Sequence, residues 1–156
     1  MRNGEPVDGI AFFELLSDDA QFCQELGRAV LAASRLETEL KNYLTANGVG
    51  QDTKKATLGQ LIELAQKCEL LKRALPAFEM LKLQRNYLTH NVHPLFASMI
   101  EETILPRTDL LDSDIDMFTE RARQLAENLN GVADALISMA KAPNSNSSRP
   151  PAAAAE

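Results

Sequence analysis

The sequence predicts an all-α fold: a bundle of four long helices, with a short N-terminal helix before them and a long loop before the last one. Three observations support this. Apolar residues recur at alternating steps of three and four over long stretches of the chain. No stretch shows the apolar–polar alternation of a strand, so we expect no strands. Aromatic residues make up only 5% of the 156 residues, which suits helix packing through Leu, Ala and Met.

The chain is expected to divide into three parts. Residues 1–16 form a loose lead-in that carries a short helix over residues 10–16, and residues 17–142 form the helical bundle. Residues 143–156 are low in complexity and are expected to be a disordered tail. The start lacks a secretory signal and no apolar run is long enough to span a membrane, so we expect a cytoplasmic protein.

The first long helix is expected to begin after a cap formed by Ser17 or Asp18, with Gln21 at capping-box spacing from Asp18. It should end at Asn47 and Gly48, residues that favour a helix C-terminus. Its predicted core stripe consists of Phe22, Leu26, Ala29, Ala33, Leu36, Leu40 and Tyr43.

Thr57 and Gln60 have the spacing of a capping box, which predicts a second, shorter helix. The third helix is expected to begin at Pro76, since proline is favoured in the first turn, and to stop near Asn91. A loop of about twenty residues should follow it, a length that is often functional.

The last long helix is expected to begin at Ser113, with Asp114 and Asp116 in its first turn, where acidic side chains complement the helix dipole. Lys141 and Pro143 should end it. Its predicted core stripe consists of Ile115, Phe118, Ala122, Leu125, Leu129, Val132, Leu136 and Met139.

The third helix carries the candidate functional residues. On a helical wheel its apolar residues fall on two flanks, and its polar residues fill the remaining arc. This pattern predicts a helix central to the bundle, left with a narrow polar groove. The first flank holds Phe78, Leu81, Leu88 and Val92, the second holds Met80, Leu83 and Tyr87, and the polar arc holds Arg85, Thr89, Lys82, Asn86, Glu79 and His90.

The stretch Arg85-Asn86-Tyr87-Leu88-Thr89-His90 resembles the R-x(4–6)-H signature of HEPN domains, in which the residue after the arginine is usually polar. Together with the order of helices, the resemblance covers roughly residues 18 to 141. It implies a metal-independent endoribonuclease that works as a homodimer, with the two motifs lining one cleft. A role as a growth-arrest toxin or a phage-defence effector, held in check by an antitoxin or regulatory protein, is compatible with it.

The motif supplies what metal-free RNA cleavage needs. A histidine such as His90 can take the proton of the 2′-hydroxyl, because the unperturbed pKa of the imidazole is near neutrality. The planar fork of Arg85 matches phosphate oxygens, and Asn86 can orient His90 or contact the phosphate. We expect Lys82 and Thr89, on the same polar arc, to contact the RNA. The products would be a 2′,3′-cyclic phosphate and a 5′-hydroxyl.

The spacing of the motif also favours a dimer. On an ideal helix Arg85 and His90 point about 140° apart, at ~100° per residue, so one helix aims them poorly at a single phosphorus atom. A dimer that pools two such pairs would solve this problem. In HEPN toxins that are silenced by an AMP-adding antitoxin, a tyrosine stands two residues after the histidine. Val92 occupies that position here, so regulation by that route is not expected.

The formal net charge of −6 disfavours binding of nucleic acid by bulk electrostatics, but the charge is unevenly distributed. Residues 54–90 carry seven basic and three acidic side chains, so the basic charge is concentrated on the segment that holds the motif. Such a patch can steer a polyanion. A solvated helix surface of mixed charge explains the same composition.

Other interpretations of these residues remain open. The chain could be a non-catalytic helical dimer that binds a partner protein or a nucleotide in the motif groove, or Arg85 and His90 could only cover the solvent face of the helix. His93 could anchor the loop. A zinc site from His90, His93 and Glu101 or Glu102 is disfavoured because the spacing fits no known ligand pattern. We therefore expect no metal and no cofactor, and we expect Cys23 and Cys68 to be buried thiols within helices.

Overall fold

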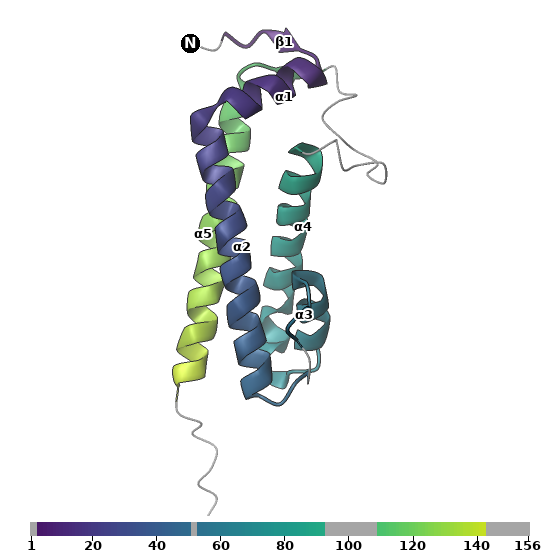
Figure 1. The fold of residues 1–156 in the computed structure, drawn as a ribbon, viewed down its shortest axis with the longest axis vertical. Coiled ribbons are helices and arrows are strands. Elements are labelled where there is room, and N and C mark those ends of the chain that lie inside the picture. The colour runs from purple at the N-terminus through teal and green to yellow at the C-terminus, as the bar shows by residue number, and fades with distance from the viewer. Residues whose placement is uncertain (1–2, 51–52, 93–108, 143–156) are drawn as a thin grey trace, which may run out of the picture.

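The computed structural model describes residues 3–50, 53–92 and 109–142, and for residues 87–92 it describes the backbone alone (Figure 1). The described residues are mostly helical, which confirms the predicted all-α class. Their elements are β1 (Pro6–Val7), α1 (Gly9–Asp18), α2 (Ala20–Ala46), α3 (Leu58–Ala65), the 3-10 helix η1 (Glu69–Ala74), α4 (Leu75–Val92), β2 (Leu110–Leu111) and α5 (Asp114–Lys141).

Helices α2 and α5 form the central pair. They lie side by side and both run away from the end that carries α1, so the pair is parallel (Figure 1). Their stripes of apolar residues face each other, and Leu36 and Leu40 of α2 are fully buried, as is Leu129 of α5. Arg35 ties the two helices at their surface, where its guanidinium donates to Asn130 Oδ1 at 2.9 Å and to Asp134 Oδ1 at 2.5 Å.

A second, smaller apolar cluster closes the end of the pair under α1. The rings of Phe12 and Phe118 meet edge to face, with centroids 5.4 Å apart, a favourable arrangement for two aromatic quadrupoles. The buried members of this cluster are Phe12, Leu16, Phe22, Leu110, Ile115 and Phe118. The predicted short N-terminal helix is therefore present as α1, and it packs onto the central pair through Phe12 and Leu16.

The N-terminal lead-in is ordered by a small sheet, contrary to the expectation of a loose segment and no strands. β1 pairs antiparallel with β2, and the carboxylate of Asp112 accepts hydrogen bonds from the backbone N–H groups of Asn3, Gly4 and Glu5 at 3.0, 2.7 and 3.1 Å. Each strand is only two residues long. Such a pairing leaves no local pattern in the sequence, because its partners are about 100 residues apart in the chain.

The helix ends agree with the sequence in most places. Gln60 Oε1 accepts from the backbone N–H of Thr57 at 2.9 Å, so the predicted capping box of α3 is confirmed. Gly48 follows the end of α2 with φ +71°, as the predicted C-terminal stop requires. The predicted N-cap of α2 is wrong, because Asp19 holds that position and its carboxylate accepts from Phe22 N at 2.6 Å. Ser113 precedes α5 as expected.

The position of α4 differs from the expectation. Phe78 and Leu81 are buried, but Met80 and Leu83 on the second apolar flank are 51% and 65% exposed. The helix therefore lies at the edge of the structure, because α2 and α5 already bury each other and α4 needs only one flank to cover them. The finer prediction of four long helices is not confirmed, since α3 spans eight residues.

Two smaller expectations are also settled by the structure. Cys68 is buried but lies between helices, whereas Cys23 is exposed, which contradicts the prediction of two buried thiols within helices.

No helix among the described residues is long and apolar enough to cross a membrane. The predicted tail at 143–156 and most of the predicted loop, residues 93–108, lie outside the described residues.

The central pair can be tested with two leucines of α2. Leu36→Ala should lower the free energy of unfolding by roughly 2–5 kcal/mol, because it leaves a cavity at a fully buried position. Leu31 is 73% exposed, so the matched control Leu31→Ala should change the free energy of unfolding by less than about 0.5 kcal/mol. Urea denaturation of both proteins measures the difference. Equal losses would contradict the packing of α2 against α5.

The Asp112 hydrogen bonds predict a pH dependence of stability. The N–H groups of Asn3, Gly4 and Glu5 hold the pKa of Asp112 below its ordinary value, with the bond from Asn3 contributing most. A lowered folded-state pKa stabilises the protein above the unfolded pKa, and this contribution is lost as the pH falls through the folded value. In thermal unfolding between about pH 5 and about pH 2, Asp112→Asn should therefore lose less stability than the parent and should start from a lower Tm. Exposed Asp18→Asn, the control, should behave as the parent.

Candidate functional site

The motif lies on the half of α4 that approaches the α1 end of the molecule (Figure 1). Arg85 and Asn86 are both half-buried, and the helix continues unbroken through position 90 to Val92. Positions 85 and 90 are therefore separated by about 140° around the helix, as predicted, at ~100° per residue. The side chains of Thr89 and His90, and all of His93, lie outside the described residues.

Arg85 faces α2 across a groove. The groove has a volume of about 230 Å³ and lies between α2, α4 and α5. Its lining residues are Leu26, Ala29, Val30, Ala33, Ser34, Glu37, Arg85 and Leu125. The members from α2 follow one another at helical steps and form a stripe beside the buried core stripe. Ala29, Ala33 and Leu125 are buried and make an apolar floor.

The groove combines this apolar floor with two opposite charges. Arg85 supplies a guanidinium from α4 and half-buried Glu37 supplies a carboxylate from α2. Within the described part of the chain, the Glu37 side chain has no hydrogen-bond or ion-pair partner. The hydroxyl of Ser34 donates to Val30 O at 3.2 Å, and its oxygen keeps acceptor capacity at the rim. An apolar slot with a few polar groups at its edges is the usual form of a small ligand site.

Lys82 is placed differently from the other predicted site residues. Its ammonium lies 2.9 Å from the carboxylate of Glu79 on the same helix, which offsets its charge. Its Cδ lies about 4.0 Å from the point where a Cβ on Gly59 of α3 would be. Lys82 therefore packs along α3, while Arg85 faces α2, so the structure does not bring these two predicted site residues to one groove.

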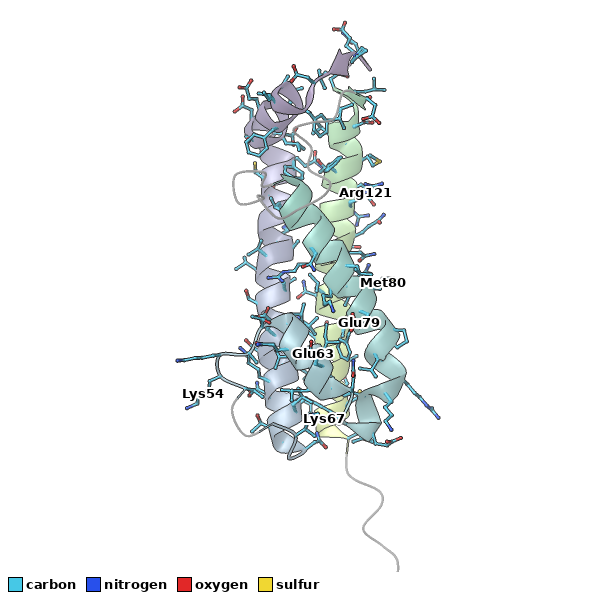
Figure 2. All side chains as sticks on the ribbon, turned by 90° about the vertical axis from the view of Figure 1, so that its right-hand side faces the viewer. Lys54, Glu63, Lys67, Glu79, Met80 and Arg121 are labelled. Carbon is cyan, nitrogen blue, oxygen red and sulfur yellow. The ribbon has the colours of Figure 1, made fainter. Side chains whose placement is uncertain are left out.

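The basic surface of residues 54–90 lies toward the other end of α4. Lys54 and Lys67 gather at the end of the molecule near α3, with Glu63 close to them, while Glu79 and Met80 lie further along α4 (Figure 2). Ten residues of helix separate the start of α4 from Arg85, or about 15 Å at ~1.5 Å per residue. Lys54 and Lys67 therefore do not lie at the motif, although the sequence places them and the motif on one basic segment.

A wider groove on the other side of α2 has a different character. It is about 660 Å³ in volume and runs between α2 and α5. Its charged residues pair with one another: Arg28 with Glu25 at 2.8 Å, Arg35 with Asp134, and Arg123 with Glu127. On the same side of α5, hydrogen bonds from Arg123 and Gln124 lower the pKa of Glu120 to about 2. These paired charges stabilise helix surfaces and leave the groove at Arg85 as the better candidate.

The sequence alone does not single out Ser34 and Glu37. They lie on α2, about fifty residues before Arg85, and nothing in their local pattern distinguishes them from other polar positions of a surface helix. A groove formed by two helices is visible only when their packing is known. Within the described residues, no group of three or more His, Cys, Asp and Glu side chains could hold a metal ion.

Comparisons with protein-family models, with curated proteins and with solved structures found no match to this chain. A functional assignment therefore depends on the residues of the motif helix and on the groove beside it.

The basic surface predicts salt-dependent binding of a polyanion. Lys54→Glu combined with Lys67→Glu should weaken binding of single-stranded RNA at low salt, because two attractive charges become repulsive. The dependence of log K on log salt should also become shallower, by about 0.7 for each phosphate that the protein no longer neutralises. Fluorescence anisotropy at several salt concentrations measures both. Arg121→Glu, toward the opposite end of the molecule, serves as the control, and because it makes half the change in net charge, an effect half as large would show that only net charge matters (Figure 2).

Proposed function

We propose that the chain is a HEPN-type, metal-independent endoribonuclease whose active site is shared by two copies in a homodimer. The observation that carries the proposal is the motif itself: Arg85, Asn86 and position 90 all lie on one uninterrupted helix. An uninterrupted helix fixes the relative positions of these residues, as catalysis requires.

The proposed reaction needs only groups that the motif supplies. His90 takes the proton of the ribose 2′-hydroxyl, and the 2′-oxygen forms a bond to the adjacent phosphorus in line with the P–O5′ bond. That bond breaks, and its electron pair leaves with the 5′-oxygen, which is protonated by solvent. Arg85 stabilises the negative charge that develops on the phosphate, and Asn86 orients His90 or the phosphate. The products are a 2′,3′-cyclic phosphate and a 5′-hydroxyl. Thr89 and Lys82 are proposed to contact the RNA.

The exposed flank of α4 supports a dimer through this helix. Met80 and Leu83 are large apolar side chains left in contact with solvent, and their i,i+3 spacing places them on one face of α4, where a second helix could cover both. Helix register places position 90 about 20° from position 83 around α4, at ~100° per residue. A second copy packed on this flank would therefore lie next to His90, and its α4 would complete a bundle of long helices.

The proposed role is that of a cytoplasmic growth-arrest toxin or phage-defence effector. The resemblance of the motif to HEPN domains supports this role, and an antitoxin or regulatory protein would hold the enzyme in check. Because Val92 replaces the tyrosine that is modified in some HEPN toxins, control would come from binding of such a protein and not from that modification.

A second candidate function is a helical dimer that binds a nucleotide or a partner protein without cleaving it. One observation favours it. Arg85 faces the groove on the α2 side, whereas the periodicity of the helix places position 90 on the opposite side of α4. In this alternative the groove is a binding pocket and the motif histidine has no catalytic part.

Cleavage of a labelled pool of tRNA and mRNA in EDTA distinguishes the two. The parent protein should cut RNA to cyclic-phosphate ends, and His90→Ala and Arg85→Ala should each lower the rate by roughly 10²–10⁴-fold, the usual contribution of an acid–base or electrostatic group.

Two variants provide matched controls. His93→Ala removes the other histidine of the chain, and Arg73→Ala removes an exposed arginine of η1. Both should keep the parent rate, and circular dichroism should show all four variants folded. Cleavage by folded His90→Ala at the parent rate would refute the nuclease mechanism, and absence of cutting by every protein would favour the binding module.

A further inference from the structure

The groove at Arg85 is too small for a whole nucleotide. Pockets for drug-sized ligands usually measure about 300–1,000 Å³, and this groove measures about 230 Å³. It can accept one flat ring system while the attached sugar and phosphate remain outside. Its floor of Ala29, Ala33 and Leu125 offers an apolar surface to the face of such a ring.

Glu37 determines which ring fits. An ionised carboxylate is an acceptor with two oxygens, so it best matches a base edge with two adjacent N–H donors. Guanine has such an edge, since N1–H and the N2 amino group lie side by side. Adenine and cytosine place a ring acceptor beside their amino group, and uracil places carbonyls on both sides of its N–H, so each would bring an acceptor against the carboxylate. Within the described part of the chain, no other side chain forms a hydrogen bond or an ion pair with the Glu37 carboxylate, so its oxygens can accept from a ligand.

Arg85 supplies the other half of the recognition. RNA-binding proteins hold unpaired bases by stacking them on planar side chains, including the arginine guanidinium, and by hydrogen bonds to the Watson–Crick edge. Arg85 lines the same groove from α4, where its guanidinium can cover the face of the base or hold the adjacent phosphate. The groove therefore carries a donor group for the nucleotide at one wall and an acceptor for the base at the other.

We propose that the groove between α2 and α4 binds a single unpaired guanine of an RNA strand, with Glu37 accepting from its N1–H and N2 amino group and Arg85 holding its face or its phosphate. This inference deepens the proposed function and rests on it, since it assigns the ribonuclease a preference for guanine in the strand that it cleaves. It gives α2 a direct part in substrate recognition, in addition to its part in the core.

The test measures binding without cleavage. Labelled 2′-O-methyl pentanucleotides cannot react through the 2′-hydroxyl, so Kd values from fluorescence anisotropy report binding alone. The parent should bind UUGUU roughly 5- to 150-fold more tightly than UUAUU, UUCUU or UUUUU, the range expected for a bidentate pair worth about 1–3 kcal/mol. Glu37→Gln, which replaces one acceptor by a donor, should bring the four affinities within about twofold of one another.

Two further variants separate the groove from general effects. Glu39→Gln changes an acidic residue of the same helix that does not line the groove, and it should keep the preference for guanine. Ser34→Leu fills the groove from its exposed rim and should abolish the preference without lowering the Tm.

The outcomes for this inference and for the nuclease can be told apart. A guanine preference lost in Glu37→Gln supports the inference even if the protein cleaves nothing, and that result would refute only the nuclease. Equal affinity of the parent for all four oligonucleotides, or binding of none of them, would overturn the inference even if RNA cleavage is observed. An unchanged preference in Glu37→Gln would overturn it as well.

Discussion

The pairing of α2 with α5 is the interaction on which the rest of the structure depends. Two helices of 27 and 28 residues bury their apolar stripes against each other, and the resulting parallel pair provides a surface for every other element. The Phe12–Phe118 cluster closes one end of the pair, and α3 with the first half of α4 covers one side of the other end. Because this pair already forms most of the core, α4 contributes only one of its apolar flanks.

The candidate site is a consequence of that arrangement. A helix in the centre of a bundle would have all its faces packed and could present its polar groups only to other helices. At the edge, α4 keeps Met80 and Leu83 exposed on one side, and on another side it leaves a groove between Arg85 and the stripe of α2 that ends in Glu37. We propose that a second copy covers the first of these surfaces and that the RNA strand reaches the second.

The sequence predicts those features that depend on local periodicity and capping. The stripe of α2, the stripe of α5 as far as Leu136, the Thr57–Gln60 box and the Gly48 stop are predictable because each is set within a few residues of the chain. Met139, predicted to continue the α5 stripe, is 40% exposed, because it lies in the last turn of the helix, beyond the buried part of the pair. The N-cap of α2 is not, because Asp18 and Asp19 are chemically equivalent candidates. The β1–β2 pair and the exposed flank of α4 depend on packing between distant segments, and Ser34 and Glu37 are linked to Arg85 only by the position of α2 beside α4. The motif itself is visible because its residues are adjacent on one helix.

The most direct test of a shared active site is complementation between two inactive proteins. Arg85→Ala and His90→Ala are purified separately, mixed so that subunits exchange, and assayed for RNA cleavage in EDTA against each variant alone. If two copies pool their motifs in one cleft, the mixture contains heterodimers with one intact Arg85 and one intact His90, and its rate should rise well above that of either variant. Exchange without any recovery, while the parent protein cleaves, would contradict a site shared between copies.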